Sequence, residues 1–243
     1  MKYRAVIFDM DGTILDTVED LKNAVNFALK ECGHRHDFTY EDTKLLFGSG
    51  VKVAFERALA LENGAPYSVL ESIGAESDGN EYGVIEEEVQ KIQQVYLPYY
   101  EKNCLIKTGP YAGIPEAIRK IREQGILTAV VSNKPHAAVL SLVDELFPGL
   151  FDYAAGEMPG IKRKPAPDMT EAALKFFNID KKDAVYVGDS EIDMLTATNS
   201  GLDFIAVDWG FRGREFLAAH NADIIVSDSE GLVAEILDHG FKE

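Results

Sequence analysis

The sequence predicts an α/β fold, a doubly wound and mostly parallel Rossmann-like sheet, with an all-helical domain inserted into it. Two observations predict the sheet: short apolar segments that suit buried parallel strands, and helical patterns that alternate with them. A third predicts the insert, because no clear strand pattern occurs between residues 17 and 104. At 243 residues, the chain has room for one large domain or for a core with a smaller companion.

The first predicted strand covers residues 4–8, a largely apolar run that ends at Asp9. A strand without a polar face suits a parallel sheet that is covered on both sides. Later segments of the same character are residues 127–131, 153–155, 184–187 and 204–207, with 224–226 as a sixth candidate. Between them, helical spacing predicts helices over 114–123, 136–146, 168–177, 191–200 and 213–220.

The inserted stretch carries helical patterns of its own. They cover residues 18–32, 40–46, 51–61 and 85–100. Thr17 followed by Asp20 resembles a capping box at the first of these helices. Residues 71–83 are rich in glycine and acidic side chains, which predicts a mobile loop. We therefore expect an α/β core from residues 1–16 and 105–243, and a helical domain from residues 17–104.

Composition excludes several functional classes. The chain has 24 Lys and Arg against 41 Asp and Glu, a net charge of −17, which disfavours nucleic acid and anionic membranes as partners. Two cysteines are too few for a disulfide framework, and no apolar run is long enough to span a membrane. The N-terminal apolar run is too short for a signal peptide. We expect a cytoplasmic protein.

Acidic residues follow two of the predicted strands. Asp9 and Asp11 follow the first strand, and Asp189 and Asp193 follow strand 184–187. Each pair alone also fits a solvated turn or an ordinary acidic helix start. The carboxyl ends of parallel strands meet at one edge of the sheet, so both pairs are expected there. Several carboxylates in one crevice favour Mg²⁺, and the five histidines lack the spacing of a zinc site.

Polar and basic residues are expected at the same edge. Ser132 and Asn133 follow strand 127–131 and can donate hydrogen bonds to phosphate oxygens. Lys164 lies in a basic run before a predicted helix, where it can hold an anion as a point charge. The basic run is also compatible with a solvated loop. Together these residues predict a site for an anionic, phosphorylated ligand.

In this order and context the residues resemble the four motifs of the haloacid dehalogenase superfamily. The matching segments are Asp9–Thr13, Ser132, Lys164 with Pro165, and Asp189 with Asp193. The resemblance covers essentially the whole chain. It implies a Mg²⁺-dependent phosphohydrolase that acts on a small phosphorylated metabolite, with the helical insert as a cap that closes over the site.

The resemblance also implies a role for each residue. Asp9 attacks phosphorus and forms an aspartyl phosphate, while Asp11 serves as general acid and base and binds Mg²⁺ through its carbonyl. The carboxylates of Asp9 and Asp189 are metal ligands, and Asp193 orients the site from the edge of the metal. The transferring oxygens are held by Ser132, Lys164 and Asn133.

Within the superfamily, residues 16–26, 47–59 and 109–114 are most similar to phosphoglycolate phosphatases, which implies 2-phosphoglycolate as the substrate. Gly48, Ser49 and Gly50 form a loop whose backbone amides suit an anion. Lys52 and Arg57 are candidates to pair with the substrate carboxylate. A glycine-rich helix start with surface cations explains the same pattern without a ligand.

Other functions fit parts of the sequence. A pyrophosphatase or a broad sugar-phosphate phosphatase would share the core motifs. Mutases resembling β-phosphoglucomutase have Gly-Val after the second aspartate and a cap histidine at the position of Leu21, so Thr13 and Leu21 argue against them. Dehalogenases lack the second aspartate. A phosphoacceptor switch resembling response-regulator receivers is disfavoured by Asp11, because a built-in acid and base shortens the life of an aspartyl phosphate.

Overall fold

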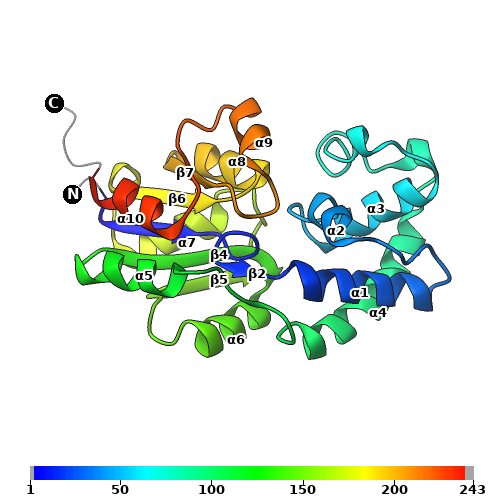
Figure 1. Cartoon of the computed structure of the whole chain (residues 1–243), viewed down its shortest axis with the longest axis horizontal. Coiled ribbons are helices and arrows are strands. Elements are labelled where there is room, and N and C mark those ends of the chain that lie inside the picture. The colour runs from blue at the N-terminus through cyan, green and yellow to red at the C-terminus, as the bar shows by residue number, and fades with distance from the viewer. Residues whose placement is uncertain (1–2, 239–243) are drawn as a thin grey trace. The chain divides into compact units, whose positions relative to one another are not determined.

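The computed structural model describes residues 3–238; His239 and the other terminal residues of the predicted core lie outside the described residues. The chain divides into two compact units (Figure 1). One joins the residues up to Asp16 with those from Gly109 onward, and the other is Thr17–Thr108. No helix among the described residues combines the length and apolar character needed to cross a membrane.

The core contains a six-stranded sheet in the order β5–β4–β1–β6–β7–β8, and its neighbouring strands are parallel. The strands are β1 (Ala5–Phe8), β4 (Leu127–Pro135), β5 (Tyr153–Glu157), β6 (Ala184–Gly188), β7 (Asp203–Val207) and β8 (Ile225–Val226). This architecture confirms the predicted parallel α/β fold. Strand β4 extends beyond its predicted end at Val131, because its irregular pairing with β5 continues through polar residues to Pro135.

Helices lie between the strands along the chain. They are α5 (Ile114–Glu123), α6 (His136–Leu146), α7 (Asp168–Phe177), α8 (Glu191–Ser200), α9 (Arg214–Ala219) and α10 (Ser229–Asp238). The first four have the predicted bounds. Helix α10, which packs against α5, was not predicted.

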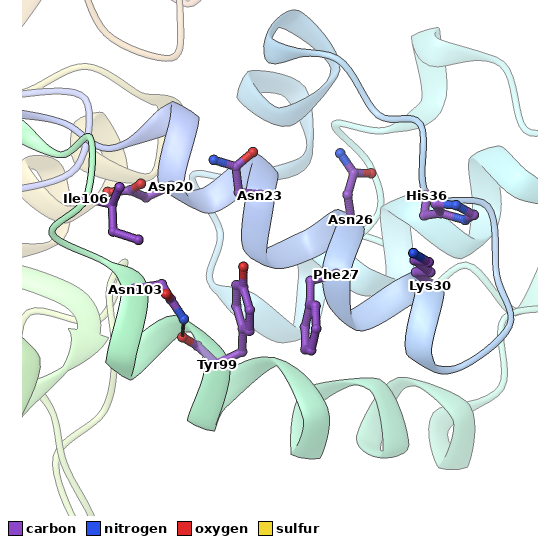
Figure 2. A pocket seen from close by; sticks show the side chains of 9 residues that line it. All are labelled: Asp20, Asn23, Asn26, Phe27, Lys30, His36, Tyr99, Asn103 and Ile106. Atoms are coloured by element: carbon purple, nitrogen blue, oxygen red, sulfur yellow. Dashed lines mark hydrogen bonds between the residues drawn. The ribbon is translucent and has the colours of Figure 1, made fainter.

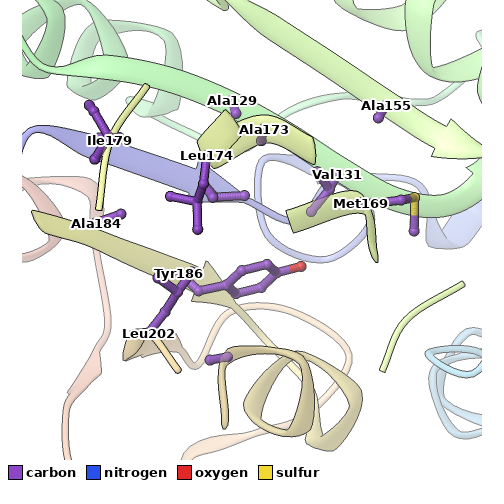
Figure 3. Close-up of a cluster of buried hydrophobic side chains, with 13 residues drawn as sticks. Ala129, Val131, Ala155, Met169, Ala173, Leu174, Ile179, Ala184, Tyr186 and Leu202 are labelled. Carbon is purple, nitrogen blue, oxygen red and sulfur yellow. The ribbon is translucent and has the colours of Figure 1, made fainter. Parts of the chain in front are cut away.

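Both faces of the sheet are buried. On one face, β1, β4 and β6 contribute Ile7, Val131 and Tyr186 to a cluster with Met169 and Leu174 of α7 (Figure 3). The alternate residues on the opposite face are buried as well: Val6, Phe8, Val130, Val185 and Val187. A sheet buried on both faces explains why its strands are continuous apolar runs rather than alternating patterns.

A second, two-stranded antiparallel sheet lies where the chain leaves and re-enters the core. It pairs β2 (Leu15–Asp16) with β3 (Gly109–Pro110). These strands are too short to produce a pattern in the sequence, and only the pairing of distant segments reveals them.

The inserted unit is helical, as its sequence predicts. It contains α1 (Val18–Glu31), α2 (Tyr40–Leu46), α3 (Val51–Glu62), α4 (Glu86–Asn103) and the short 3₁₀ helices η1 (Tyr67–Val69) and η2 (Asn80–Tyr82). Helix α1 packs along α4, where Phe27 and Tyr99 stack with ring centroids 3.9 Å apart. Phe55 of α3 meets Tyr96 of α4 edge to face. The unit therefore has its own apolar core.

The predicted capping box at Thr17 is wrong. The Thr17 side chain makes no capping hydrogen bond. Asp20 instead accepts hydrogen bonds from the backbone amides of Lys107 and Thr108, each at 2.8 Å. These contacts tie the last residues of the insert to its first helix, so the compact unit extends to Thr108 rather than ending at residue 104.

Residues 71–83 form a series of turns. Ile73 is fully buried, and Gly74 lies so close to α3 that a Cβ atom there would be 2.4 Å from Val53. Gly74 has a φ of +92°, a conformation that glycine adopts readily. The mobility of this segment stays a prediction, but Ile73 and Gly74 have a packing role.

Candidate active site

The strand register brings the first predicted residues together. Phe8 of β1 lies opposite Val130 of β4 and Val187 of β6. The following residues, Asp9 after β1 and Asp189 after β6, therefore lie at the same edge of the sheet. Ser132 of β4 follows at this edge two residues after Val130. Parallel strands bring these side chains together although they are far apart in the sequence.

Lys164 links two buried carboxylates. Its Nζ donates hydrogen bonds to Asp9 Oδ1 at 2.6 Å and to Asp193 Oδ1 at 2.8 Å, and lies 3.2 Å from the Tyr186 hydroxyl. Burial disfavours the charged ammonium, but the charges of Asp193 and Asp9 outweigh it and raise the pKa of Lys164 well above its usual value. The lysine is therefore positively charged at neutral pH.

The carboxylates at this edge repel one another. Burial and the charges of Asp193 and Asp189 raise the pKa of Asp9 well above its usual value, against the opposing charge of Lys164. Burial and the charge of Asp193 raise the pKa of Asp189 to about 7. Lys164 alone does not balance the buried carboxylates of Asp9, Asp189 and Asp193, so these three groups favour a further positive charge close by.

Asp189 is held on both of its oxygens. Thr13 Oγ1 donates to Oδ1 at 2.9 Å, and the backbone amide of Phe211 donates to Oδ2 at 2.7 Å. A Cβ atom at Gly12 or Gly210 would lie only 2.3 Å from Oδ2. The two glycines thus permit a close backbone cradle around this carboxylate.

Asp193 combines a local and a distant role. Its Oδ2 accepts hydrogen bonds from the Ser190 hydroxyl at 2.6 Å and from the backbone amides of Ser190 and Asp189, completing a capping box at α8. Its Oδ1 faces Lys164. A side chain that caps a helix and pairs with a lysine is well fixed to orient its neighbours.

The acidic residues fit a hard divalent cation. One carboxylate oxygen each from Asp9, Asp189 and Asp193 lie within 4.8 Å of one another, and within residues 3–238 they form the one such group of side chains with donor atoms for a metal ion. Buried carboxylate oxygens are the ligands that Mg²⁺ prefers. Burial raises the pKa of Asp9 and of Asp189, and the charge of Asp193 raises each further, so a cation beside them would relieve both desolvation and repulsion.

Ser132 and Asn133 have different surroundings. Ser132 is buried, and its Oγ accepts a hydrogen bond from the amide of Lys134 at 3.1 Å. The carboxamide of Asn133 pairs with the backbone of Lys164: its Nδ2 donates to the carbonyl, and its Oδ1 accepts from the amide at 2.8 Å. The side chain of Asn133 therefore positions Lys164, and its binding of phosphate stays a prediction.

The sequence interpretation missed Lys134. Its side chain is buried, and its Nζ lies 3.1 Å from Asp11 Oδ1 in an ion pair. Lys134 lies two residues after Ser132, and alternate strand residues point the same way, so this spacing was the available signal. The edge therefore holds two buried lysines, one near Asp9 and one near Asp11.

The segment after β7 was also missed. The Trp209 indole donates to the Thr13 carbonyl at 3.1 Å, and the Phe211 amide holds Asp189. Arg212 forms a two-pronged ion pair with Glu191 at the start of α8. A backbone amide can belong to almost any residue type, so the sequence does not reveal such donors. The available signal was Gly210, because a glycine allows the backbone to come close to Asp189.

In the insert, Arg57 does not have the predicted role. Its buried guanidinium donates hydrogen bonds to the carbonyls of Leu45, Leu46, Phe47 and Ile73 and to Ser49 Oγ. These contacts are made with the loop that precedes α3 and with the turns after it. The expected direct pairing of Arg57 with a substrate carboxylate is therefore corrected, because its donors hold the backbone.

The rest of the predicted insert loop has the conformation of a helix start. Gly48 and Gly50 have φ values of +111° and +91°, and Gly50 is the N-cap residue of α3. Ser49 is buried and bonded to Arg57. Lys52 pairs with Glu56 at 3.2 Å and with Glu86 at 2.8 Å, so its charge is already balanced within the insert.

A separate groove lies between α1 and α4 of the insert (Figure 2). It is lined by Asp20, Asn23, Asn26, Phe27, Lys30, His36, Tyr99, Asn103 and Ile106. None of the predicted insert residues lines it. Most of its side chains are polar. The carboxamide of Asn26 already binds the backbone of Phe38: its Nδ2 donates to the carbonyl, and its Oδ1 accepts from the amide.

Comparison with known proteins gives a consistent result. Residues 6–207 match the family model of the haloacid dehalogenase-like hydrolases. A crystal structure from Lactobacillus delbrueckii subsp. bulgaricus, provisionally named a phosphoglycolate phosphatase, superposes with a TM-score of 0.94 at 51% identity, covering 98% of this chain and 99% of that one.

Two curated relatives are named phosphoglycolate phosphatase. The protein from Cereibacter sphaeroides is 32% identical over 212 residues, 85% of this chain and 86% of the relative. The protein from Pseudomonas savastanoi pv. phaseolicola is 28% identical over 236 residues, 97% of this chain and 80% of the relative. The family match covers most of the chain and includes the acidic edge, so this protein belongs to the haloacid dehalogenase-like hydrolase family.

Proposed function

We propose that this protein is a Mg²⁺-dependent phosphatase that hydrolyses 2-phosphoglycolate to glycolate and phosphate through an aspartyl phosphate on Asp9. The observation that carries the proposal is the buried arrangement of Asp9, Lys164, Asp193 and Asp189 at one edge of the sheet. The relatives that match most of the chain support the substrate, because they are named for it.

In the first step, a carboxylate oxygen of Asp9 attacks the phosphorus of the ester. The bond from phosphorus to the alcohol oxygen breaks, and Asp11 donates a proton to that oxygen. In the second step, Asp11 takes a proton from a water molecule that attacks the phosphorus. The bond between Asp9 and phosphorus then breaks, which regenerates the enzyme.

Lys164 and Ser132 hold the transferring oxygens in this scheme. Lys164 keeps its positive charge beside Asp9, where an anionic nucleophile has to approach an anionic phosphate. Asn133 supports it by holding the backbone of Lys164. Such preorganised charge is the main source of catalysis in phosphoryl transfer.

Asp9, Asp189 and the backbone carbonyl of Asp11 would hold the Mg²⁺ ion, with Asp193 orienting the site through Lys164. When bound, the ion supplies positive charge that offsets the charge of the phosphate oxygens. Thr13 and the Phe211 amide keep Asp189 in place for this role.

In the insert, the loop of Gly48, Ser49 and Gly50 remains our candidate for recognising the rest of the substrate. Arg57 contributes by fixing the shape of that loop. Lys52, at the following helix start, is the candidate cation of this loop, although two glutamates already share its charge.

The test is phosphate release with Mg²⁺ and with EDTA. The panel should hold 2-phosphoglycolate, pyrophosphate, β-glucose 1-phosphate, glycerol phosphates and p-nitrophenyl phosphate. We expect kcat/KM for 2-phosphoglycolate to exceed the others by about a hundredfold. Even activity across the panel would retain the phosphatase and reject the substrate, and no Mg²⁺-dependent release from any ester would reject both.

The covalent step has its own test. Asp9→Asn removes the nucleophile while preserving size, so we expect turnover to fall at least about ten-thousandfold with an unchanged circular dichroism spectrum. Rapid quenching of the wild-type enzyme with radiolabelled substrate should trap a short-lived acyl phosphate. An acyl phosphate that persists for minutes would instead favour a phosphoacceptor switch.

A further inference from the structure

We propose that the hydroxyl of Tyr186 positions the ammonium of Lys164 for the transfer of the phosphoryl group. This inference rests on the proposed phosphatase function and adds a positioning residue to it. In the sequence, Tyr186 is one residue of the apolar strand that precedes Asp189, and nothing in that pattern predicts a role in the site.

Tyr186 lies in the middle of β6 and is fully buried. Its ring belongs to the apolar cluster on one face of the sheet (Figure 3) and stacks with Phe204, with ring centroids 6.4 Å apart. A phenylalanine would fill the same space without a hydroxyl. Burying a hydroxyl costs free energy unless new hydrogen bonds replace those made with water, so its presence has to be explained by its partners.

The partners of this hydroxyl are charged groups of the site. Its oxygen accepts a hydrogen bond from Lys164 Nζ at 3.2 Å, and its O–H donates to Asp193 Oδ1 at 3.3 Å. The same ammonium also donates to Asp193 Oδ1 and to Asp9 Oδ1. An ammonium has three N–H donors, so these three partners account for all of them. Tyr186 thus completes the hydrogen bonding of Lys164.

The three partners of Lys164 differ in what happens to them during the reaction. Asp9 becomes bonded to phosphorus in the proposed first step, so its contact with the lysine has to change. Asp193 and Tyr186 are not altered, and they bond to each other as well as to Nζ. These two side chains therefore define where the ammonium lies during the transfer. A phenol is neutral at pH 7, so it fixes the lysine without reducing the positive charge that the phosphate oxygens meet.

The experiment compares Tyr186→Phe with Tyr153→Phe, each of which removes one hydroxyl and keeps the ring. Tyr153 of β5 is the matched control: its ring packs against Phe176 and Phe177, and its hydroxyl has no hydrogen-bond partner among the described residues. Rates are measured with the Mg²⁺-loaded enzyme on 2-phosphoglycolate and on ethyl phosphate, which share the phosphoryl group and differ in the carboxylate. Urea denaturation gives the folded fraction of each variant.

We expect Tyr186→Phe to lower kcat about tenfold on both esters and to change KM less than about threefold, because the lysine is held for the transfer step. Vanadate, which can adopt the five-coordinate geometry of the transfer, should inhibit this variant about tenfold more weakly than the wild type. Inorganic phosphate should inhibit both alike, and Tyr153→Phe should keep wild-type values. A wild-type kcat in Tyr186→Phe, or a loss confined to one ester, would overturn the inference.

A double-mutant cycle tests whether the hydroxyl acts through Lys164. In Lys164→Met there is no ammonium to position, so adding Tyr186→Phe should lower kcat less than about twofold further. Equal losses from Tyr186→Phe in both backgrounds would overturn the inference, because the hydroxyl would then act independently of the lysine. Either contrary result with an active wild-type enzyme leaves the phosphatase intact. If the wild type hydrolyses neither ester, the proposed function fails, and the inference fails with it.

Discussion

Lys164 in the core and Arg57 in the insert are both buried basic residues, yet their surroundings differ. Lys164 faces the carboxylates of Asp9 and Asp193, whereas Arg57 faces backbone carbonyls and one serine. A lysine is a compact point charge, and an arginine is a planar fork of five donors. The comparison teaches that a buried cation indicates chemistry when its partners are acidic side chains, and architecture when its partners are backbone groups.

Removing each cation is the strongest test of this comparison. Lys164→Met leaves two buried carboxylates without a counter-charge, so we expect kcat/KM for ethyl phosphate to fall about a thousandfold. We also expect a loss of about 3–5 kcal/mol in the free energy of unfolding. Phosphate release measures the effect on kcat/KM. Urea denaturation, with and without Mg²⁺, measures the effect on the free energy of unfolding.

Arg57→Met is the counterpart in the insert. Its loss leaves several buried carbonyls without donors, which should cost about 2–4 kcal/mol in unfolding free energy. The rate for ethyl phosphate should change less than about tenfold in folded enzyme, because the core residues are untouched. A chemical defect as large as that of Lys164→Met would break the distinction between the two cations.

The next prediction concerns the core, where the backbone of Gly210 lies against the carboxylate of Asp189. Gly210→Ala places a Cβ atom against Asp189 Oδ2, so we expect the half-saturating Mg²⁺ concentration to rise about tenfold to a hundredfold. Gly213→Ala is the control, because a Cβ atom there meets nothing within 4 Å. An unchanged Mg²⁺ requirement in Gly210→Ala would argue against Asp189 as a metal ligand.

The free energy of unfolding should also depend on pH, because of two buried carboxyl groups in the core. Burial raises the pKa of Asp9 and of Asp189, the latter to about 7, so the folded core binds protons that the unfolded chain has released. This stabilisation is present at acid pH and is lost as pH rises toward and through 7, by about 1.4 kcal/mol per pH unit for each proton released.

Mg²⁺ should reverse this trend, because it favours the ionised carboxylates. The measurement is urea unfolding between pH 5 and 8, in EDTA and in Mg²⁺. We expect stability in EDTA to fall with rising pH and stability in Mg²⁺ to be largely maintained. A metal-free core that gains stability over this range would contradict the raised pKa values.

The smallest expected effects concern the start of the insert. Asp20→Asn weakens two hydrogen bonds from backbone amides and should cost about 1–2 kcal/mol in unfolding free energy. Thr17→Ala should stay within about 0.5 kcal/mol, because the Thr17 hydroxyl makes no capping bond. The measurement is urea denaturation of both variants. A larger loss of stability in Thr17→Ala than in Asp20→Asn would support the capping box predicted from the sequence.

The class of the fold and most of its elements could be predicted from the amino-acid sequence. The signals for these elements are local: apolar runs in β1, β4 and β6, and helical spacing in α5–α8. A strand that is buried on both faces of a sheet has apolar residues at successive positions, and this pattern is visible in the sequence. The acidic pairs after β1 and β6 were visible for the same reason, since strand ends in a parallel sheet share an edge.

Which polar side chains meet depends on the three-dimensional packing and could not be predicted in the same way. The pairing of Lys134 with Asp11, the hold of the Phe211 amide on Asp189 and the enclosure of Arg57 by carbonyls all join segments through space. Their energies depend on burial and on distances between atoms, and a one-dimensional pattern contains neither. The sequence determined the elements and the site's location, and the three-dimensional packing decided how each charge is used.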